Sequence, residues 1–228
     1  MPEPPTRLIE VTEALLGKNE DIAARNRALF GKRGMLVLNV LSSPGSGKTT
    51  LIHRAIAELS PELALGVIVG DLATDNDAKR LREAGGPVIQ ITTGTVCHLE
   101  AEMVARAAND MGLDGLDILV IENVGNLVCP SAYDLGEDIR IVLLATTEGE
   151  DKPLKYPTMF RTADAVILNK SDISEVLGFD REAALAAIRA VSPAAPIFEV
   201  SARTGAGMDA FYRYLRDRLA AKRSASAG

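Results

Sequence analysis

The chain has 228 residues, of which 47% are hydrophobic and 25% are charged, a balance typical of one globular domain with short appendages. Its formal net charge of -6 gives no general attraction to nucleic acid or to an anionic membrane. The longest apolar runs, Met35–Leu41 and Ile139–Ala145, are far shorter than the roughly 20 residues that a membrane-spanning helix needs. Residues Met1–Pro5 lack the features of a secretory signal, so we expect a cytoplasmic protein.

The first residues predict a helical lead-in, which we place at residues 1–34. Apolar residues recur with loosely helical spacing over Leu8–Phe30, and charged residues fill the gaps. From residue 35 onward, short apolar runs alternate with amphipathic stretches. We therefore expect one domain over residues 35–222, followed by a frayed tail at residues 223–228.

Short runs rich in β-branched residues predict the strands of this domain. Because each run is almost wholly apolar, both of its faces should be covered, which favours a mainly parallel sheet of about seven strands between two layers of helices. The predicted fold is therefore α/β and doubly wound. The strands are expected at Leu36–Leu41, Gly66–Val69, Val88–Ile91, Ile118–Ile121, Ile139–Leu144, Ala165–Leu168 and Ile197–Val200. The helices are expected at Thr49–Leu59, Asp75–Glu83, Leu99–Ala108, Asp180–Ala190 and Met208–Lys222.

A phosphate-binding loop (P-loop) is predicted after the first strand, where the chain has the sequence Ser-Ser-Pro-Gly-Ser-Gly-Lys-Thr over Ser42–Thr49. Small residues let successive backbone N–H groups turn toward phosphate oxygens, and the next helix adds the positive end of its dipole. Lys48 supplies a charge for the β- and γ-phosphates. Ser42 stands where the pattern usually has its first glycine. The predicted phosphate contacts are Ser43, Pro44, Gly45, Ser46, Gly47, Lys48, Thr49 and Thr50.

Carboxylates after two other strands are candidate Mg²⁺ ligands. Strand ends in an open α/β sheet face the ligand crevice, and this places Asp71, Asp75 and Glu122 beside the P-loop. The Thr49 hydroxyl, Glu122 and one of Asp71 or Asp75 fit the oxygen shell that Mg²⁺ prefers. The alternative roles are a helix cap for Asp75 and a turn for Asp71.

The segment Glu122–Gly125 is predicted to respond to the γ-phosphate. It has the sequence Glu-Asn-Val-Gly, where many GTPases carry Asp-x-x-Gly, and the Gly125 N–H can follow the γ-phosphate. We assign the catalytic roles to Lys48, Glu122 and Gly125. Neither candidate loop has an obvious glutamine to orient the attacking water, so we expect slow hydrolysis by the isolated protein and a contribution from a partner.

The base is predicted to be guanine, because Asn-Lys-Ser-Asp follows an apolar run at Asn169–Asp172. The Asp172 carboxylate can accept from both guanine N1–H and the exocyclic amine, whereas adenine offers no matching pair of donors. Lys170 can lay its stem over the base, and Asn169 can tie the loops together. The segment Ser201-Ala202-Arg203 is expected to place a backbone N–H against the guanine carbonyl.

The two cysteines of the chain, Cys97 and Cys129, each follow a predicted strand, and His98 adjoins the first. Thiolate and imidazole suit Ni²⁺ and Zn²⁺, and Cys129 follows closely on Glu122–Gly125, so metal and nucleotide could communicate. The alternative is that both thiols are packed in the core and that His98 caps a helix. Three ligands also leave a tetrahedral shell incomplete, so water or a second subunit would have to contribute.

Together these motifs resemble the HypB family of hydrogenase nickel-incorporation GTPases. The resemblance rests on SSPGSGKTT, GDLATDND, TGTVCHLEAEMV, ENVGNLVCP, EGEDKPLKYP, LNKSD and VSARTGAGMDAFYRYL. It implies a SIMIBI-like P-loop GTPase domain at residues 35–222, with GTP or GDP, Mg²⁺, and Ni²⁺ and/or Zn²⁺ as cofactors. It also implies nickel delivery during hydrogenase maturation, a nucleotide-dependent homodimer, and an interface metal site at Cys97, His98 and Cys129. The implied partners are a small zinc-containing accessory protein and the hydrogenase large subunit.

Other functions remain open at this point. The nickel GTPases of urease maturation resemble the chain but carry a Cys-Pro-His metal motif, whereas Cys97 and His98 are directly adjacent here. A nucleotide-gated interaction module with a structural zinc is a second alternative. An ATP-dependent kinase is a third, and Asp172 argues against it. The chain has two histidines and no histidine-rich tract, which argues against nickel storage.

Overall fold

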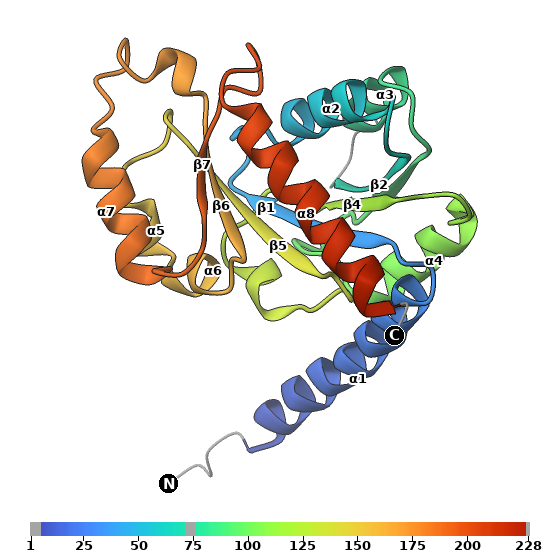
Figure 1. Cartoon of the computed structure of the whole chain (residues 1–228). Coiled ribbons are helices and arrows are strands. Elements are labelled where there is room, and N and C mark those ends of the chain that lie inside the picture. Colours follow the sequence, from blue (N-terminus) through green and yellow to red (C-terminus); the bar gives the residue numbers. More distant parts are fainter. Residues whose placement is uncertain (1–5, 72–75, 227–228) are drawn as a thin grey trace, which may run out of the picture.

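The structure, a computed structural model, describes residues 6–71 and 76–226. Within these residues seven strands form one sheet, in the order β3-β2-β4-β1-β5-β6-β7, and every pair of neighbours is parallel (Figure 1). The predicted α/β fold is confirmed, and the sheet is wholly rather than mainly parallel. The strands are β1 (Leu36–Ser42), β2 (Leu65–Asp71), β3 (Val88–Thr92), β4 (Ile118–Glu122), β5 (Ile139–Ala145), β6 (Ala165–Asn169) and β7 (Ile197–Glu199).

Several strands continue into the polar residues that were expected just after them. Ser42, Asp71, Glu122 and Asn169 are the last residues of β1, β2, β4 and β6. The ladder extends to them because backbone hydrogen bonds do not depend on side-chain polarity. These side chains are consequently fixed by the sheet itself.

The helices surround the sheet on both sides. The predicted helices are found with shifted ends, and the short helices α5 and α6, each with a proline near its start, were not predicted. The helices are α1 (Thr6–Gly31), α2 (Lys48–Leu59), α3 (Asn76–Glu83), α4 (Ala101–Met111), α5 (Lys152–Lys155), α6 (Pro157–Arg161), α7 (Arg181–Val191) and α8 (Met208–Ser226). Two 3-10 turns, η1 (Cys129–Ala132) and η2 (Ser171–Ile173), lie in loops. None of the described helices combines the length and the apolar composition that crossing a bilayer would take.

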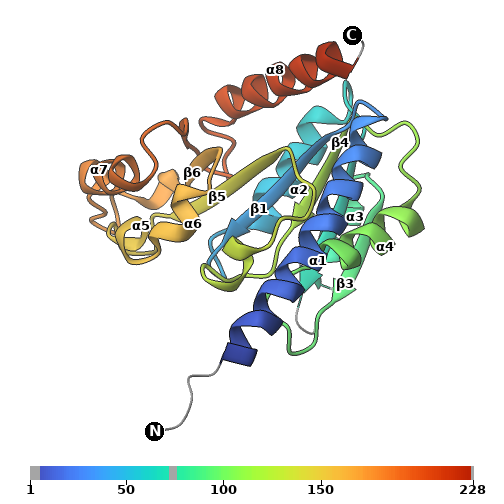
Figure 2. The same ribbon diagram turned by 90° about the horizontal axis from the view of Figure 1, so that it is seen from below.

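The sheet has a covered core on each face, as the apolar strands predict. Leu38 and Val40 of β1 point to the core under α2, α3 and α8, whereas Val37 points to the core that α1 and α4 cover. Figure 2 shows α8 on one side of the sheet and α1 on the other. This alternation buries both faces of the central strand, so an almost continuous apolar run is required there.

The C-terminal half of α1 packs against the domain beside α4 (Figure 2). Ala23 and Phe30 are fully buried on it. At the other end of the chain, α8 continues beyond Lys222 to Ser226, and Arg223 pairs with Asp117. The division into a lead-in, a domain and a frayed tail stays a prediction.

Candidate nucleotide and metal site

The P-loop joins β1 to α2 and makes a tight turn through two glycines. Gly45 and Gly47 have φ values of 75° and 100°, a region that residues with a Cβ rarely adopt. A Cβ on Gly47 would lie only 2.6 Å from Nδ2 of Asn169. Glycine is therefore required at position 47 both by the backbone and by the base-binding loop packed against it.

Ser42 replaces the first glycine of the motif without strain. It is the last residue of β1 and is fully buried, and its φ is not positive. Its hydroxyl oxygen accepts a hydrogen bond from Lys48 Nζ at 2.9 Å and also contacts the hydroxyl of Ser46. The side chain that a glycine would lack therefore holds Lys48 in place.

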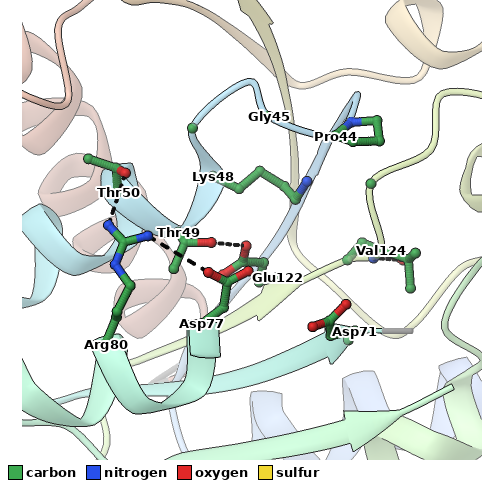
Figure 3. A pocket seen from close by; sticks show the side chains of 14 residues that line it. Pro44, Gly45, Lys48, Thr49, Thr50, Asp71, Asp77, Arg80, Glu122 and Val124 are labelled. Atoms are coloured by element: carbon green, nitrogen blue, oxygen red, sulfur yellow. Dashed lines mark hydrogen bonds and ion pairs between the residues drawn. The ribbon is translucent and has the colours of Figure 1, made fainter. Parts of the chain in front are cut away.

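The corner predicted to hold Mg²⁺ is built around Glu122 (Figure 3). Thr49 Oγ1 donates to Glu122 Oε1 at 2.7 Å, while Oε2 is buried and has no hydrogen-bond partner in the described part of the chain. Burial raises the pKa of Glu122 to about 7 and lowers that of Lys48. A buried carboxylate with one oxygen unbonded is a position that a divalent cation would satisfy, so the residues fit Mg²⁺.

Glu122, Lys48 and Thr49 line a cavity of about 400 Å³. Asp71 also lines this cavity, as do residues that sequence reasoning missed. Asp77 and Arg80 reach it from α3, and Arg80 Nη2 donates to Thr50 Oγ1 at 3.3 Å. The helix was predicted, but which of its faces meets the P-loop depends on tertiary packing. Asp75, the other candidate for Mg²⁺, lies outside the described residues.

Gly125 approaches the P-loop from the opposite side of this cavity. A Cβ on Gly125 would lie 3.0 Å from Cα of Pro44, closer than most real contacts of that kind. Both residues line the cavity. The Glu122–Gly125 turn therefore lies beside the phosphate loop, as predicted.

A second cavity of about 460 Å³ adjoins the first and contains the predicted guanine-binding residues. Asn169 ties two loops together, because its Nδ2 donates to Ser46 O at 2.9 Å and its Oδ1 accepts from Ala202 N at 3.0 Å. Lys170 has a left-handed backbone, with φ 62°, and its Nζ donates to Gly45 O at 2.8 Å.

Asp172 faces this second cavity and remains accessible at its wall. Its side chain is 16% exposed, and Arg203 Nε lies 3.5 Å from its Oδ2. Ser201, in contrast, is fully buried, and its Oγ accepts from Thr204 N at 3.1 Å, so it supports the turn instead of lining the cavity. Arg80 lines this cavity as well as the first.

Most of the predicted nucleotide-binding residues line these two cavities. Ser46 is buried within the P-loop, and Ser43 lines a neighbouring hollow with Pro44 and Gly125. Those that line the cavities are Pro44, Gly45, Gly47, Lys48, Thr49, Thr50, Asn169, Lys170, Asp172, Ala202 and Arg203.

The predicted nickel or zinc ligands come together at one end of α4. The Cys129 thiol raises the pKa of the Cys97 thiol by hydrogen bonding to it, so the two side chains are neighbours. His98 stacks on Tyr133 with ring centroids 3.9 Å apart, and its Nδ1 lies 3.9 Å from Cys97 Sγ. Its Nε2 is buried, has no hydrogen-bond partner among the described residues, and lies 3.7 Å from Glu100 Oε1.

These side chains form a cluster but not a finished coordination shell. Within residues 6–71 and 76–226, no three His, Cys, Asp or Glu side chains are arranged to hold a metal ion. Both cysteines are free thiols and are half-buried. The three side chains are therefore close to one another, but they would have to move before they could bind one metal ion together.

Two buried asparagines of α1 hold the backbone segments that flank this cluster, and sequence reasoning missed them. We call these two segments the walls of the cluster. Asn26 Nδ2 donates to Ala101 O at 2.8 Å and to Leu135 O at 3.1 Å. Asn19 Oδ1 accepts from Ala101 N at 2.8 Å. The spacing of seven residues places Asn19 and Asn26 on one face of α1, which was the available signal. The helix thus fixes the backbone just after His98.

Comparisons with known proteins agree with this geometry. The family model described as the CobW/HypB/UreG nucleotide-binding domain matches residues 36–199. The chain is 51% identical over 209 residues to hydrogenase maturation factor HypB of Rhizobium leguminosarum bv. viciae, which covers 92% of this chain and 70% of that protein. It is 50% identical over 209 residues to HypB of Escherichia coli strain K12, covering 92% of this chain and 72% of that protein.

Solved structures give the same picture. The crystal structure of HypB from Helicobacter pylori in complex with nickel is similar with a TM-score of 0.85 and 45% identity, covering 90% of this chain and 97% of that one. The 54 kDa signal recognition particle protein from Aeropyrum pernix K1 shares the fold alone, with a TM-score of 0.57 and 16% identity over 85% of this chain and 49% of that one. Together with the sheet order, these similarities confirm the SIMIBI-like P-loop fold.

Proposed function

This chain belongs to the HypB family of hydrogenase maturation factors, and from that premise we propose that it is a GTPase that delivers nickel during maturation of nickel–iron hydrogenase. The observation that carries the nucleotide part is the continuity of the two cavities, which share Gly47, Thr50 and Arg80. One cavity holds the buried Lys48 and Glu122, and the other holds Asp172. The spacing of these groups suits a guanine base at one end and a triphosphate at the other.

Each residue has a defined role in this proposal. Lys48 is held by Ser42 and supplies positive charge to the β- and γ-phosphates, and Gly125 offers its N–H to the γ-phosphate. Thr49, Glu122 and Asp71 would hold Mg²⁺, which neutralises charge on the phosphates when it is bound. Neither the Asp71 loop nor the Glu122 loop has an obvious glutamine to orient water, so the intrinsic rate should be slow.

The nickel part rests on the cluster of Cys97, His98 and Cys129. Two thiols and an imidazole are ligands that Ni²⁺ accepts. The Nε2 of His98 makes no hydrogen bond within the described residues and offers a lone pair when the ring is neutral with its proton on Nδ1. Burial lowers the pKa of His98, which favours that neutral form. The similar HypB of Helicobacter pylori was solved in complex with nickel.

A homodimer would complete the metal site. Three side chains leave a tetrahedral shell one ligand short, and a two-fold axis through the cluster would bring a second set of the same groups. We propose that GTP favours this dimer, and that hydrolysis releases the metal to the hydrogenase large subunit with the help of a small zinc-containing accessory protein. A cytoplasmic location is part of the same proposal.

The test is the affinity of the protein for Ni²⁺ with GDP and with a non-hydrolysable GTP analogue, measured by calorimetry alongside the oligomeric state. A GTPase that loads and releases nickel must show different affinities in the two nucleotide states, because linkage requires it. Equal affinities, or binding of ATP as tightly as GTP, would contradict the proposal.

A structural zinc clamp is the second candidate, favoured by the contact between the thiols of Cys97 and Cys129 beside the stacked Tyr133 ring. The variant Cys97→Ala distinguishes the two functions. Loss of both dimer and fold would support the clamp, whereas an intact GTPase that fails to activate hydrogenase would support delivery. Urease maturation is a further candidate, since one relative is named hydrogenase/urease maturation factor HypB of Helicobacter pylori, with 44% identity over 214 residues.

A further inference from the structure

Buried polar side chains run in an unbroken series from the turn after β4 to the loop that carries Cys129. Asn123 Nδ2 donates to Asn39 Oδ1 at 3.2 Å, and Asn39 Nδ2 donates to Glu137 Oε1 at 3.0 Å. Arg140 Nη2 donates to the same Glu137 oxygen at 2.7 Å. We call these four residues the polar relay. Asn123, Asn39 and Glu137 are buried, so water does not compete for these bonds.

One end of the polar relay lies in the nucleotide site and also touches the backbone beside His98. Asn123 follows Glu122 directly and lines the phosphate cavity. Its Oδ1 accepts from Val124 N at 2.9 Å and from Leu99 N at 3.3 Å. One amide therefore holds both the turn that faces the γ-phosphate and the residue after His98. The helix α4 begins at Ala101, not at Leu99 as the sequence predicts, because Glu100 has an extended backbone and forms the N-cap.

The other end of the polar relay holds the loop of Cys129. Arg140 Nη1 donates to Ser131 O at 3.1 Å, and its Nη2 donates to Tyr133 O at 3.0 Å. Ser131 belongs to η1, which begins at Cys129, and Tyr133 stacks on His98. Glu137 Oε2 accepts from Leu135 N at 2.7 Å. Both walls of the thiol cluster are thus bonded to the same four side chains.

The position of Asn39 argues that the polar relay does more than stabilise the fold. It is the fully buried polar residue in the middle of β1, the central strand, where it lies opposite Ile121 of β4 and Arg140 of β5. A polar side chain there costs free energy unless all its bonds are made, and an apolar residue of similar size would avoid that cost. A fully bonded buried network instead fixes one arrangement of its members, so movement at one end disturbs the other.

We propose that the polar relay positions the Cys97–His98 and Cys129 segments according to the nucleotide bound beside Glu122. The γ-phosphate draws the Glu122–Gly125 turn toward the P-loop, Asn123 moves with it, and its bonds to Leu99 and Asn39 carry the shift to the two walls of the cluster. The four residues are positioning residues, which act on the metal through the backbone of the two segments. This inference rests on the proposed function, because it concerns how GTP sets the affinity for Ni²⁺.

The experiment compares the ratio of Ni²⁺ affinities, with the GTP analogue over GDP, between the natural protein and two variants. Asn39→Leu cuts the relay in the middle with a side chain of similar size. Arg140→Lys keeps the charge beside Glu137 but cannot reach both carbonyls. Coupling ratios of roughly 5 to 150 are typical of allosteric proteins. Because the bond between Asn123 and Leu99 remains in both variants, we expect the ratio to fall by at least about threefold in each, and not to one.

The matched control is Arg189→Lys, because Arg189 Nη1 also donates to two loop carbonyls, those of Pro193 and Ala195, at a site remote from the relay. This variant should keep the natural ratio. The absorption bands of thiolate-bound Ni²⁺ give a second readout, since a merely structural defect would not remove their dependence on nucleotide. If Asn39→Leu does not fold, Arg140→Lys decides the outcome.

The results separate the relay from the function on which it rests. A ratio of one in the natural protein would overturn the proposed nucleotide control of nickel, and the relay with it. A natural protein that couples, together with relay variants that couple as strongly as Arg189→Lys, would overturn the relay alone. A selective loss in the relay variants, with GTP affinity within about threefold of the natural value, is the result that we expect.

Discussion

The nucleotide cavities and the thiol cluster differ in how completely the chain prepares them. In the second cavity, which we propose binds the base, Asn169 and Lys170 are held by bonds to the P-loop backbone. In the cluster, bonds hold the backbone around Cys97, His98 and Cys129, yet these side chains do not converge on a point where a metal ion would sit.

The difference indicates two modes of binding. A pocket whose side chains are fixed before the ligand arrives loses little conformational freedom on binding, so it can discriminate strongly between similar bases. When the side chains of a cluster must still move together to bind a metal ion, the affinity for the metal depends on how easily the backbone around them moves. Under the proposed function, nucleotide and a second subunit would tune such a site, as the capture and release of a metal require.

The largest expected effect comes from breaking the prepared pocket with Asp172→Asn. The variant loses a charged acceptor for two guanine donors, which should weaken GTP binding by about 10² to 10⁴. Its amide should instead donate to the C2 carbonyl of xanthosine triphosphate and gain affinity for that nucleotide. Calorimetry with both nucleotides checks this outcome.

Asp114→Asn is the matched control, since the Asp114 side chain is 99% exposed. It should leave the preference for GTP unchanged. An Asp172→Asn protein that still bound GTP like the natural protein would show that the second cavity does not hold the base.

The next effect concerns Glu122, whose pKa of about 7 in the folded protein lies above the ordinary value of 4.5. Between these values the folded state binds more protons than the unfolded state. Stability without nucleotide and Mg²⁺ should therefore fall as the pH rises through this window, by roughly 3 kcal/mol in total. Glu122→Gln removes this loss, so above pH about 7 the ligand-free variant should be the more stable protein.

The same variant should lose the Mg²⁺ dependence of GTP binding, because an amide is a poor ligand for that ion. Urea denaturation across the pH range measures the stability, and titration with Mg²⁺ measures the loss. Glu182→Gln, at a side chain 82% exposed, is the control that should change neither. An identical pH dependence in Glu122→Gln and the natural protein would refute the assignment of this pKa.

The smallest expected effect concerns the thiol cluster. Asn26→Ala removes one donor from the Ala101 carbonyl and leaves the Leu135 carbonyl without its Asn26 bond, which should cost about 1–3 kcal/mol of stability. Because those carbonyls hold the cluster wall, Ni²⁺ binding should weaken while GTP affinity stays constant. Asn109→Ala, on the exposed face of α4, should stay within about 0.5 kcal/mol of the natural protein.

Sequence reasoning succeeded where the signal is local. The strands are continuous apolar runs because both faces of the sheet are covered, and the P-loop and the base motif are short segments whose spacing alone carries the chemistry. The structure brings both motifs to one edge of the sheet. The places of Lys48 and Asp172 in the two cavities could therefore be predicted from their neighbours in the chain.

The sequence signal fails where a residue acts through partners far along the chain. Asn39 bonds to Glu137 at a separation of 98 residues, and nothing beside it in the sequence marks that contact. Arg80 lines both cavities only because α3 packs beside α2. The stacking of His98 on Tyr133 likewise depends on the path of a loop, so its orientation had no local signature.

The order of the strands has a consequence for how the chain reaches its native state. β1 and β2 are not neighbours, because β4 lies between them. During synthesis the unit of β2, α3 and β3 cannot dock on β1 until residues Ile118–Glu122 have left the ribosome, and apolar strand edges stay uncovered until then. Long-range parallel pairing of this kind slows folding. The newly made chain should therefore depend on chaperones over this interval, and aggregation during rapid expression is the hazard that this topology carries.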